Sequence, residues 1–338
     1  MAVIPQQLKT NQANEALSKT SHQLLYQGKV RDTWRFVLQY LLVVASDRIS
    51  IFDFVLNALI PQKGEYLTAL THFWLTDVLK DHPNHLIQLT ANPNINGINK
   101  FRDSIPGLPI ERCLLIQDLT DLLVPFELIF RLHIGGSVYN EYLKTGMAGG
   151  HTLTPDLPQW SKLDSPIFTP STKEESGHDV NITAEECLEK MGENSQTLVR
   201  TLTTMFADAY RFAEQRGILI LDTKFEASSR PLMIADEVLT PDSSRFVDAD
   251  DWKRAMAEGR SPEFFDKQPV RDWGAAQDTP KGQGIKNLDP ENPDDIAFVH
   301  GLKVPQLVIS AAVERNKIIL MRLTGLTLKQ YQKDAMGI

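Results

Sequence analysis

The sequence predicts an α+β fold, with strands dominating the first part of the chain and helices mixed with strands in the rest. From Leu24 to Ile60, short apolar runs alternate with charged turns, as is typical of strands. After about Glu193, long helical patterns are interspersed with single apolar strands. This order favours α+β over a regular βαβ alternation, and the 338 residues suffice for one large or two to three small domains.

The first half of the chain is assigned from its periodicity. Residues 1 to about 22 are polar and predict a loose arm or a short helix. Leu24 to Phe36 predicts strand, turn, strand, and Tyr40 to Ser46 a buried strand. Leu67 to Lys80 predicts an amphipathic helix. Three more strands are expected at HLIQL, RCLLIQDL and PFELIFRLHI.

The second half begins with a segment rich in Pro, Gly, Thr and Ser, from Gly146 to Asp179, which predicts a long functional or disordered loop. Thr183 and Glu186 form a capping pair at the start of a helix. The remaining expected elements are a helix from about Glu193 to Gln215, strands GILILD and PLMIAD, helices at Asp248–Glu258 and about Val304–Leu323, and a surface loop from Gly282 to Asp295.

Composition excludes several classes of protein. The net charge is -8 and no basic stripe is present, which argues against a nucleic-acid partner. The N-terminus lacks a signal-peptide pattern, and no run approaches the about 20 apolar residues of a membrane span. The two cysteines, Cys113 and Cys187, lack metal-ligand spacing. We expect a cytoplasmic protein with reduced thiols and no membrane partner.

Two polar segments of the N-terminal part are candidates for chemistry. Gly28-Lys29-Val30-Arg31-Asp32 lies between two strands, and such a hairpin can cover a nucleotide phosphate, although a plain surface turn is the simpler interpretation. The chain has no G-x-x-x-x-G-K-[ST] loop. Ser46 to Asp53 follows a buried strand and predicts either a site or a loop with an Asp–Arg pair.

Two further segments present hydroxyls, amines and guanidinium groups. Pro166 to Lys173, running on to Asp179, is a proline-stiffened stretch that predicts either a site or an ordinary connector. Arg245 and Arg271 are forked donors suited to carboxylate or phosphate.

The strongest candidate for a metal site is the segment D-T-K-F-E. Asp222, Lys224 and Glu226 share one face of a strand, and the connector ASSRP would fold the chain back so that Glu226 meets Asp236. Paired carboxylates with nucleotide phosphates are the usual Mg²⁺ ligands. The alternative is a solvated sheet face with a salt bridge. The hairpin register is open, and Leu232 and Ile234 could instead line an adenine pocket.

Together these motifs resemble the SAICAR synthetase family, in its longer form, over roughly Leu24 to Trp273. The resemblance rests on G-K-V-R-D, S-D-R-I-S-x-F-D, I-P-x-K-G, P-I-F-T-P-S-T-K, H-D-x-N-I, D-T-K-F-E, D-E-V-L-T-P-D-S-S-R and F-D-K-Q-x-x-R-D-W, in this order. It implies an antiparallel N-terminal sheet related to the small lobe of protein kinases, a larger α+β part, and the ATP cleft between them. The implied division is an arm at 1–22, a nucleotide-covering domain at 23–125 and a domain with substrate and Mg²⁺–ATP sites at 126–338.

The resemblance also implies a reaction and a set of residues. ATP, 5-amino-1-(5-phosphoribosyl)imidazole-4-carboxylate and L-aspartate would give the succinocarboxamide, ADP and phosphate in a monomer or homodimer. Catalysis would involve Lys29, Lys224 and Asp236. The implied ATP site comprises Gly28, Lys29, Arg31, Lys224, Glu226 and Asp236, with Mg²⁺ on Glu226 and Asp236. The implied substrate residues are Asp47, Arg131, Ser137, Lys173, Asp179, Arg245 and Arg271.

Three positions depart from the family pattern. The family usually has R-G-Y-L-T-G-S where this chain has R-L-H-I-G-G-S from Arg131 to Ser137, H-D-E-N-I where it has Val180, and K-F-E-F-G where it has Ala227-Ser228. Strand alternation predicts Leu132 in the core, His133 beside Arg131 on the cleft side, and Ser137 as a helix cap. A structural pair of Arg131 with Glu127 is the alternative.

Two rival functions remain open at this stage. A small-molecule kinase on the same scaffold would release ADP without an amine, and a non-catalytic relative would lack the Mg²⁺ acids, both of which are present here. In the ligase, the carboxylate would be activated by the γ-phosphoryl group of ATP, which requires positioning and charge neutralisation more than a protein nucleophile.

Overall fold

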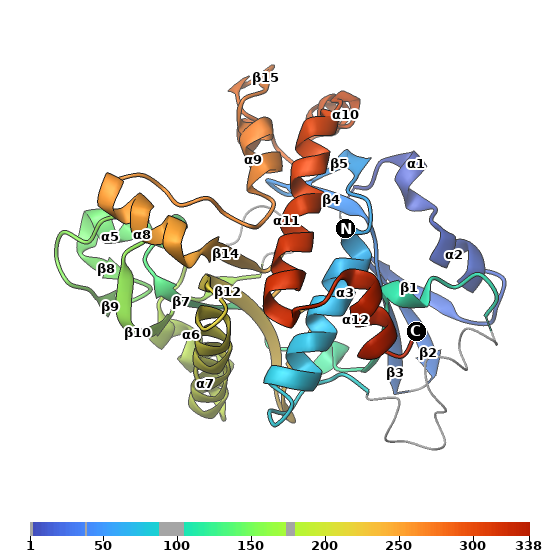
Figure 1. Cartoon of the computed structure of the whole chain (residues 1–338), viewed down its shortest axis with the longest axis horizontal. Helices are drawn as coiled ribbons and strands as arrows, with labels where there is room; N and C mark the ends of the chain where they lie inside the picture. The colour runs from blue at the N-terminus through green and yellow to red at the C-terminus, as the bar shows by residue number, and fades with distance from the viewer. Residues whose placement is uncertain (1–2, 38, 88–104, 174–179) are drawn as a thin grey trace. The chain divides into compact units, whose positions relative to one another are not determined.

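The computed structural model describes residues 3–37, 39–87, 105–173 and 180–338. The chain forms two compact units. Unit 1 comprises Met1–His72, Leu86–Asp118 and Lys267–Ile338, and unit 2 comprises Phe73–His85 and Leu119–Asp266. Unit 1 is therefore assembled from three stretches of sequence, and both chain ends belong to it (Figure 1).

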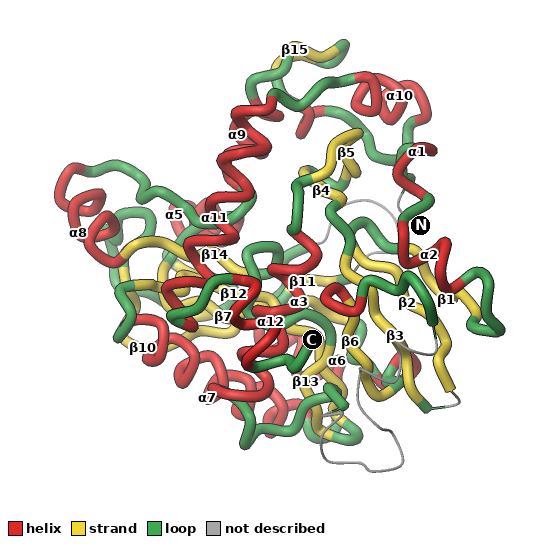
Figure 2. Tube along the Cα trace, turned by 45° about the vertical axis from the view of Figure 1, so that its right-hand side comes forward, coloured by secondary structure: helices red, strands yellow, loops and turns green. Residues whose placement is uncertain are grey.

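Unit 1 is built on an antiparallel sheet in the order β1-β2-β3-β6 (Figure 2). Its strands are β1 (Gln23–Gln27), β2 (Arg31–Val37), β3 (Tyr40–Ala45) and β6 (Cys113–Gln117). The short helix α2 (Gln12–Leu17) buries Ala13, Ala16 and Leu17 in one core cluster with Trp34 and Leu42 of the sheet. The polar arm expected at residues 1–22 thus contains α2 and α1 (Gln6–Lys9).

A second core of unit 1 joins the hairpin β4 (Arg48–Ile51) and β5 (Phe54–Leu59) to the C-terminal segment. Its apolar residues come from both, for example Ile51 and Leu56 with Val270 and Val299. Among the described residues, the helices of unit 1 outside the arm are α3 (Lys63–Phe73, whose last residue belongs to unit 2), α9 (Gln268–Ala275), α10 (Pro293–Gly301), α11 (Gln306–Thr324) and α12 (Leu328–Asp334).

Unit 2 contains a larger antiparallel sheet in the order β10-β7-β12-β13, in which β11 also pairs with β7 and β14 with β12. Its strands are β7 (Phe126–His133), β10 (Lys162–Phe168), β11 (Ser171–Thr172), β12 (Ile218–Ser229), β13 (Leu232–Ala235) and β14 (Ser244–Asp248). Its helices are α5 (Ser137–Thr145), α6 (Ala184–Met191), α7 (Ser195–Glu214) and α8 (Ala249–Glu258). Helix α7 packs on the sheet, with Phe206 close to the Phe130 ring.

Short elements connect these parts. They are the π-helix η1 (Trp74–Val78), the 3₁₀ turns η2 (Ile110–Arg112), η3 (Thr120–Leu122) and η4 (Ile285–Asn287), and the two-residue strands β8 (Met147–Ala148), β9 (His151–Thr152), β15 (Asp278–Thr279) and β16 (Gly282–Gln283). Among the described residues, no single helix is long and apolar enough to span a membrane; only α10 and α11 taken together, with an 89° bend, meet the criteria of length and composition.

The mixed α+β class is confirmed, and three local predictions are corrected. The helix expected at Leu67–Lys80 starts at Lys63 and continues from Trp74 as the π-helix η1. The long loop expected from Gly146 contains β10, which pairs with β7 because its apolar residues Ile167 and Phe168 are buried there. The described part of HLIQL forms one isolated bridge, between Leu86 and Ile116, instead of a strand.

The expected functional division at residue 125 stays a prediction. In the division into compact units, however, the segment Lys267–Ile338 belongs to unit 1 with the N-terminal sheet, because its helices supply the apolar partners of β4 and β5. The loop expected at Gly282–Asp295 contains β16, η4 and the start of α10.

Candidate active site

The predicted hairpin of β12 and β13 is present and determines where the candidate metal acids lie. Glu226 is paired with Ala235, and Asp236 follows directly after β13. Both carboxylates lie close enough to Lys173 to raise its pKa. Asp236 has a left-handed backbone (φ 58°), which ends the strand and turns the chain away. Leu232 and Ile234 belong to the same paired segment, and Ile234 is buried.

Two lysines accompany these acids. Lys173 Nζ lies 2.7 Å from Glu226 Oε1, and Lys224 Nζ lies 2.7 Å from Glu127 Oε2. Partial burial disfavours the charged form of Lys173, but the carboxylates of Glu226, Glu127 and Asp236 outweigh this and raise its pKa. The face of β12 that carries Lys224 and Glu226 therefore presents a compact group of positive and negative side chains, while Thr223 and Phe225 are buried.

A second cluster lies further along the same strand. The Nη1 atoms of Arg131 and Arg245 both donate to Oδ2 of Asp222, and Arg131 Nε donates to Thr169 Oγ1 at 2.9 Å. The Asp222 charge raises the pKa of Arg245, whereas burial and the charge of Arg245 lower that of Arg131. The alternative pairing of Arg131 with Glu127 is wrong, since Glu127 faces Lys224.

The start of helix α5 runs directly past these two guanidinium groups. A Cβ added at Gly136 would lie 3.2 Å from Arg245 Nη1 and 3.6 Å from Arg131 Nη1, and Gly136 has a φ of 67°. A Cβ at Gly135 would collide with the Trp160 ring at 2.0 Å. The two glycines thus bring the N-terminal end of a helix next to two positive side chains, which is a suitable environment for an anion.

Two predictions about this segment are wrong. Ser137 is the first residue of α5 and does not cap it; Gly136 occupies the cap position, and Ser137 Oγ donates to Asn181 Oδ1 at 3.3 Å. His133 does not stand on an open face. It is fully buried, Nδ1 donates to Trp160 O at 3.1 Å, and Nε2 accepts from the Tyr210 hydroxyl at 3.2 Å.

The burial of His133 determines its protonation state. Burial lowers its pKa to about 4, so that it is neutral at neutral pH. Trp252 covers the other part of the ring in an edge contact at 5.1 Å. Leu132 is buried as expected. Both departures from the family pattern at 132 and 133 therefore belong to packing.

Within unit 1, the candidate phosphate-covering turn is a tight connection between β1 and β2. Gly28 N donates to Arg31 O at 2.7 Å, and a Cβ at Gly28 would lie 2.8 Å from that carbonyl oxygen, so the turn requires glycine. The half-exposed Lys29 places its Nζ 2.5 Å from Asp53 Oδ1. Arg31, at the start of β2, is partly buried.

The loop after β3 does not contain the simple Asp–Arg pair that was the alternative interpretation. Asp47 binds Arg112 through both oxygens, at 2.6 and 3.0 Å, and accepts from Gly64 N at 3.0 Å. Arg48 instead pairs with Asp32. The sequence did not predict the ion pairs of Asp32, Arg48, Arg112 and Asp222. Asp32, Arg48 and Asp222 stand inside family motifs, whereas Arg112 stands in none.

Each unit thus assembles its own subset of the candidate residues. Unit 2 holds Arg131, Ser137, Lys173, Lys224, Glu226, Asp236 and Arg245, and unit 1 holds Gly28, Lys29, Arg31, Asp47 and Arg271. Asp179 lies outside the described residues.

The α+β fold, the lysine–carboxylate group and the paired arginines define an enzyme that handles anionic substrates. The chain belongs to the SAICAR synthetase family, whose model matches residues 24–287. It is accordingly an ATP-dependent ligase of purine biosynthesis, which joins 5-amino-1-(5-phosphoribosyl)imidazole-4-carboxylate to L-aspartate.

Similar proteins agree along most of the chain. The phosphoribosylaminoimidazole-succinocarboxamide synthase of Thermodesulfovibrio yellowstonii is 38% identical over 276 residues, which cover 81% of this chain and 89% of that protein. That of Saccharomyces cerevisiae is 37% identical over 273 residues, 78% of this chain and 87% of that one. Among solved structures, the SAICAR synthase from Saccharomyces cerevisiae complexed with SAICAR matches with a TM-score of 0.69 at 32% identity, covering 90% of this chain and 95% of that chain.

Proposed function

We propose that the enzyme works through a carboxyl phosphate intermediate. The imidazole carboxylate attacks the γ-phosphorus of ATP, and ADP leaves. The amine of L-aspartate then attacks the activated carbonyl carbon, the C–O bond to phosphate breaks, and the amide remains after the nitrogen loses its proton. The observation that carries this proposal is that the carboxylates of Glu226, on β12, and Asp236, just after β13, both act on Lys173, with Lys224 on the same strand as Glu226.

The Glu226–Asp236 pair fits a magnesium ion that is shared with nucleotide phosphates. Mg²⁺ usually takes one or two protein carboxylates and completes its shell with water and phosphate oxygens. Within the described ranges, no group of three or more His, Cys, Asp or Glu side chains is arranged to hold a metal, so that phosphate oxygens would have to supply further ligands. Bound there, Mg²⁺ would neutralise charge on the transferring phosphoryl group.

The protein's own groups would prepare the phosphoryl transfer by position and charge. Lys224 and Lys29 would stabilise the negative charge on the phosphates, with Gly28 and Arg31 shaping the covering turn. Lys173 would exchange its Glu226 partner for substrate, which its exposed position permits. Asp236 would orient the nucleotide from the opposite strand.

Arg131, Arg245 and Ser137 would bind the 5-phosphate or the carboxylate of the imidazole substrate at the start of α5. Two guanidinium groups beside a helix N-terminus favour an anion. Asp222 would hold both in place, since it binds one nitrogen of each. Asp47, Asp179 and Arg271 are proposed as further substrate residues.

We also propose, from the family resemblance, that the N-terminal sheet is related to the small lobe of protein kinases. The same resemblance suggests that ATP binds in a cleft between the two parts. A cytoplasmic location and a monomeric or homodimeric state belong to the same proposal, as does binding of small molecules in place of nucleic acid.

Omitting substrates one at a time tests this function. We expect ADP release only when ATP, the imidazole carboxylate and L-aspartate are all present. Equal ADP release without aspartate would favour a small-molecule kinase. When hydroxylamine replaces aspartate, its attack on the activated carbonyl carbon would release phosphate and give the hydroxamate, and detection of that hydroxamate would support the intermediate directly.

A further inference from the structure

We propose that residues 9–17 of the N-terminal arm position the turn Gly28–Val30 for nucleotide binding through the buried ion pair of Asp32 and Arg48. The inference rests on the proposed function of that turn, namely that it covers the ATP phosphates. It adds the arm, and Asn11 and Asn14 within it, as positioning residues.

Every carbonyl of the turn is held by a side chain. Arg48 Nη2 donates to Gly28 O at 3.1 Å, and Arg48 Nε donates to Lys29 O at 3.2 Å. Ser46 Oγ donates to Val30 O at 2.7 Å. With all three carbonyls turned inward, the peptide planes of the turn have fixed orientations. The direction in which the Lys29 side chain leaves the backbone is therefore determined by Arg48 and Ser46.

Arg48 is itself held by Asp32. Arg48 Nη2 lies 2.5 Å from Asp32 Oδ1, and Nη1 lies 3.4 Å from Oδ2; both side chains are only 1% exposed. A carboxylate in such a buried position is costly unless hydrogen-bond donors surround it. Arg48 serves mainly Oδ1, so that Oδ2 needs donors from elsewhere.

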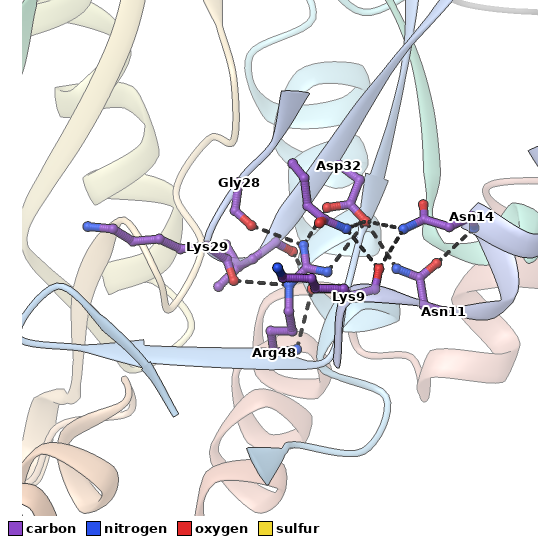
Figure 3. Close-up of polar contacts among 10 residues, drawn as sticks. Lys9, Asn11, Asn14, Gly28, Lys29, Asp32 and Arg48 are labelled. Carbon is purple, nitrogen blue, oxygen red and sulfur yellow. Dashed lines mark hydrogen bonds and ion pairs between the residues drawn. The ribbon is translucent and has the colours of Figure 1, made fainter. Parts of the chain in front are cut away.

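The arm supplies two of those donors, and Gln27 Nε2 of β1 is a third at the longer distance of 3.5 Å. Asn11 Nδ2 and Asn14 Nδ2 donate to Asp32 Oδ2 at 3.0 and 3.1 Å. Figure 3 shows both amides converging on Asp32 from one side while Arg48 approaches from the other, with the Lys29 side chain pointing away from the pair. Within the described part of the chain, Asn14 Oδ1 is buried without a partner, which indicates that donation to Asp32 sets the orientation of this amide.

The arm is held by the core of unit 1, so its contacts can fix the positions of Asp32, Arg48 and the turn. Ala13, Ala16 and Leu17 of α2 are buried in the core beneath the sheet, and Asn11 Oδ1 caps this helix by accepting from Asn14 N at 2.9 Å. The sequence of contacts runs from the core through α2 to Asp32, then to Arg48, and then to the turn. Weakening the amide contacts should loosen the turn without emptying the core.

The test compares two variants with a control on the same helix. Asn14→Leu removes the amide at similar volume, and Asn11→Ser removes the other amide while retaining a capping oxygen. Gln12→Ala, an exposed position on α2, is the control. The Kd of MgATP is measured by calorimetry on the full chain, alongside the KM values of all three substrates and the Tm.

We expect each amide variant to raise the Kd and KM of MgATP by about threefold to tenfold, the size of effect that loss of one ordinary hydrogen bond produces. The KM values of aspartate and the imidazole carboxylate should match the control. Asn14→Gln, which retains an amide, should recover part of the loss. Hydrogen exchange at the Gly28 amide should accelerate selectively, a local effect that a general loss of stability would not produce.

Two results with the amide variants would overturn the inference. One is an unchanged MgATP Kd in both variants. The other is a uniform rise in exchange across the whole sheet together with a lower Tm.

A further variant, Lys29→Met, separates a failure of the inference from a failure of the proposed function. If Lys29→Met weakens MgATP binding and the amide variants do not, only the role of the arm is wrong. If Lys29→Met has no effect either, the turn does not bind nucleotide and the inference falls with it.

Discussion

Arg48 in unit 1 and Arg245 in unit 2 both bind a buried aspartate, yet their donors are used differently. Arg48 donates to two backbone carbonyls and to both oxygens of Asp32. Arg245 shares one oxygen of Asp222 with Arg131, and among the described residues it donates to no other acceptor. Its side chain is 27% exposed, against 1% for Arg48.

This difference separates an arginine that holds the fold from one that can bind a substrate. A guanidinium has five N–H donors, and once its own chain accepts most of them, little is left for a ligand. Two guanidinium groups that compete for one carboxylate oxygen retain donors and positive charge. Both arginines stand in motifs of the family, so that motif membership alone does not tell the two roles apart.

The largest expected effect is on folding. Arg48→Met leaves Asp32 buried without its charged partner and should lower the free energy of unfolding by about 3–5 kcal/mol. Arg245→Met should cost about 1 kcal/mol or less, because Arg131 continues to pair with Asp222. Urea unfolding of both variants measures the contrast. Equal losses would break the comparison.

The next effect is on turnover. Glu226→Gln should lower kcat/KM by about 100-fold with little change in Tm, because a neutral amide neither binds Mg²⁺ well nor holds Lys173. Glu214→Gln is the matched control, since Glu214 also pairs with a lysine, Lys162, at 2.9 Å. Unchanged turnover and unchanged Mg²⁺ dependence in Glu226→Gln would contradict its assignment as a ligand.

A smaller effect is expected on substrate affinity. Arg245→Met should raise the KM of the imidazole carboxylate by about tenfold and leave MgATP binding unaltered, whereas Arg245→Lys should recover part of the loss. Arg131→Met should raise the same KM but also lower the Tm, because Arg131 is only 4% exposed and is bonded to Thr169. A change confined to stability in both variants would make this cluster structural, like that of Arg48.

The smallest effect is the loss of stability at low pH, which should be similar in the two units. Burial lowers the pKa of His72 in unit 1 and of His133 in unit 2 to about 4. A histidine with a depressed folded pKa contributes stability above its unfolded value of 6.5, and this is lost as the pH falls towards 4. Protonation linked to each histidine should lower the free energy of unfolding by about 1 kcal/mol between pH 7 and pH 5.5.

Substitution of one histidine at a time measures this acid response. His133→Gln and His72→Gln should each flatten the pH dependence of unfolding over that range by a similar amount. A much larger change for one of them would show that its unit carries an additional acid-sensitive interaction.

Much of the fold could be predicted because local signals determine it. The alternation in D-T-K-F-E, the ASSRP connector and the capping threonine Thr183 act over a few residues, and the structure contains the predicted strand, hairpin and cap. What could not be predicted depends on residues distant in sequence. His133 is buried by Tyr210 and Trp252, and the partner of Asp47 is Arg112. A strand pattern predicts on which face of the sheet a side chain lies, whereas the exposure of that side chain depends on the residues that pack over it.

The assembly of unit 1 from three stretches has a consequence for synthesis on the ribosome. The central stretch Leu119–Asp266 contains the whole β10-β7-β12-β13 sheet and its helices, and the other part of unit 2, Phe73–His85, is translated before it. Unit 2 therefore has all its residues once Asp266 has left the exit tunnel, and domains generally fold as units during synthesis. Ile51 and Leu56 of the β4–β5 hairpin, made earlier, must wait for Val270 and Val299 before their apolar surface is covered. In the nascent chain, the turn that we propose to bind nucleotide therefore belongs to the last unit to be completed, although it is among the first segments to be translated.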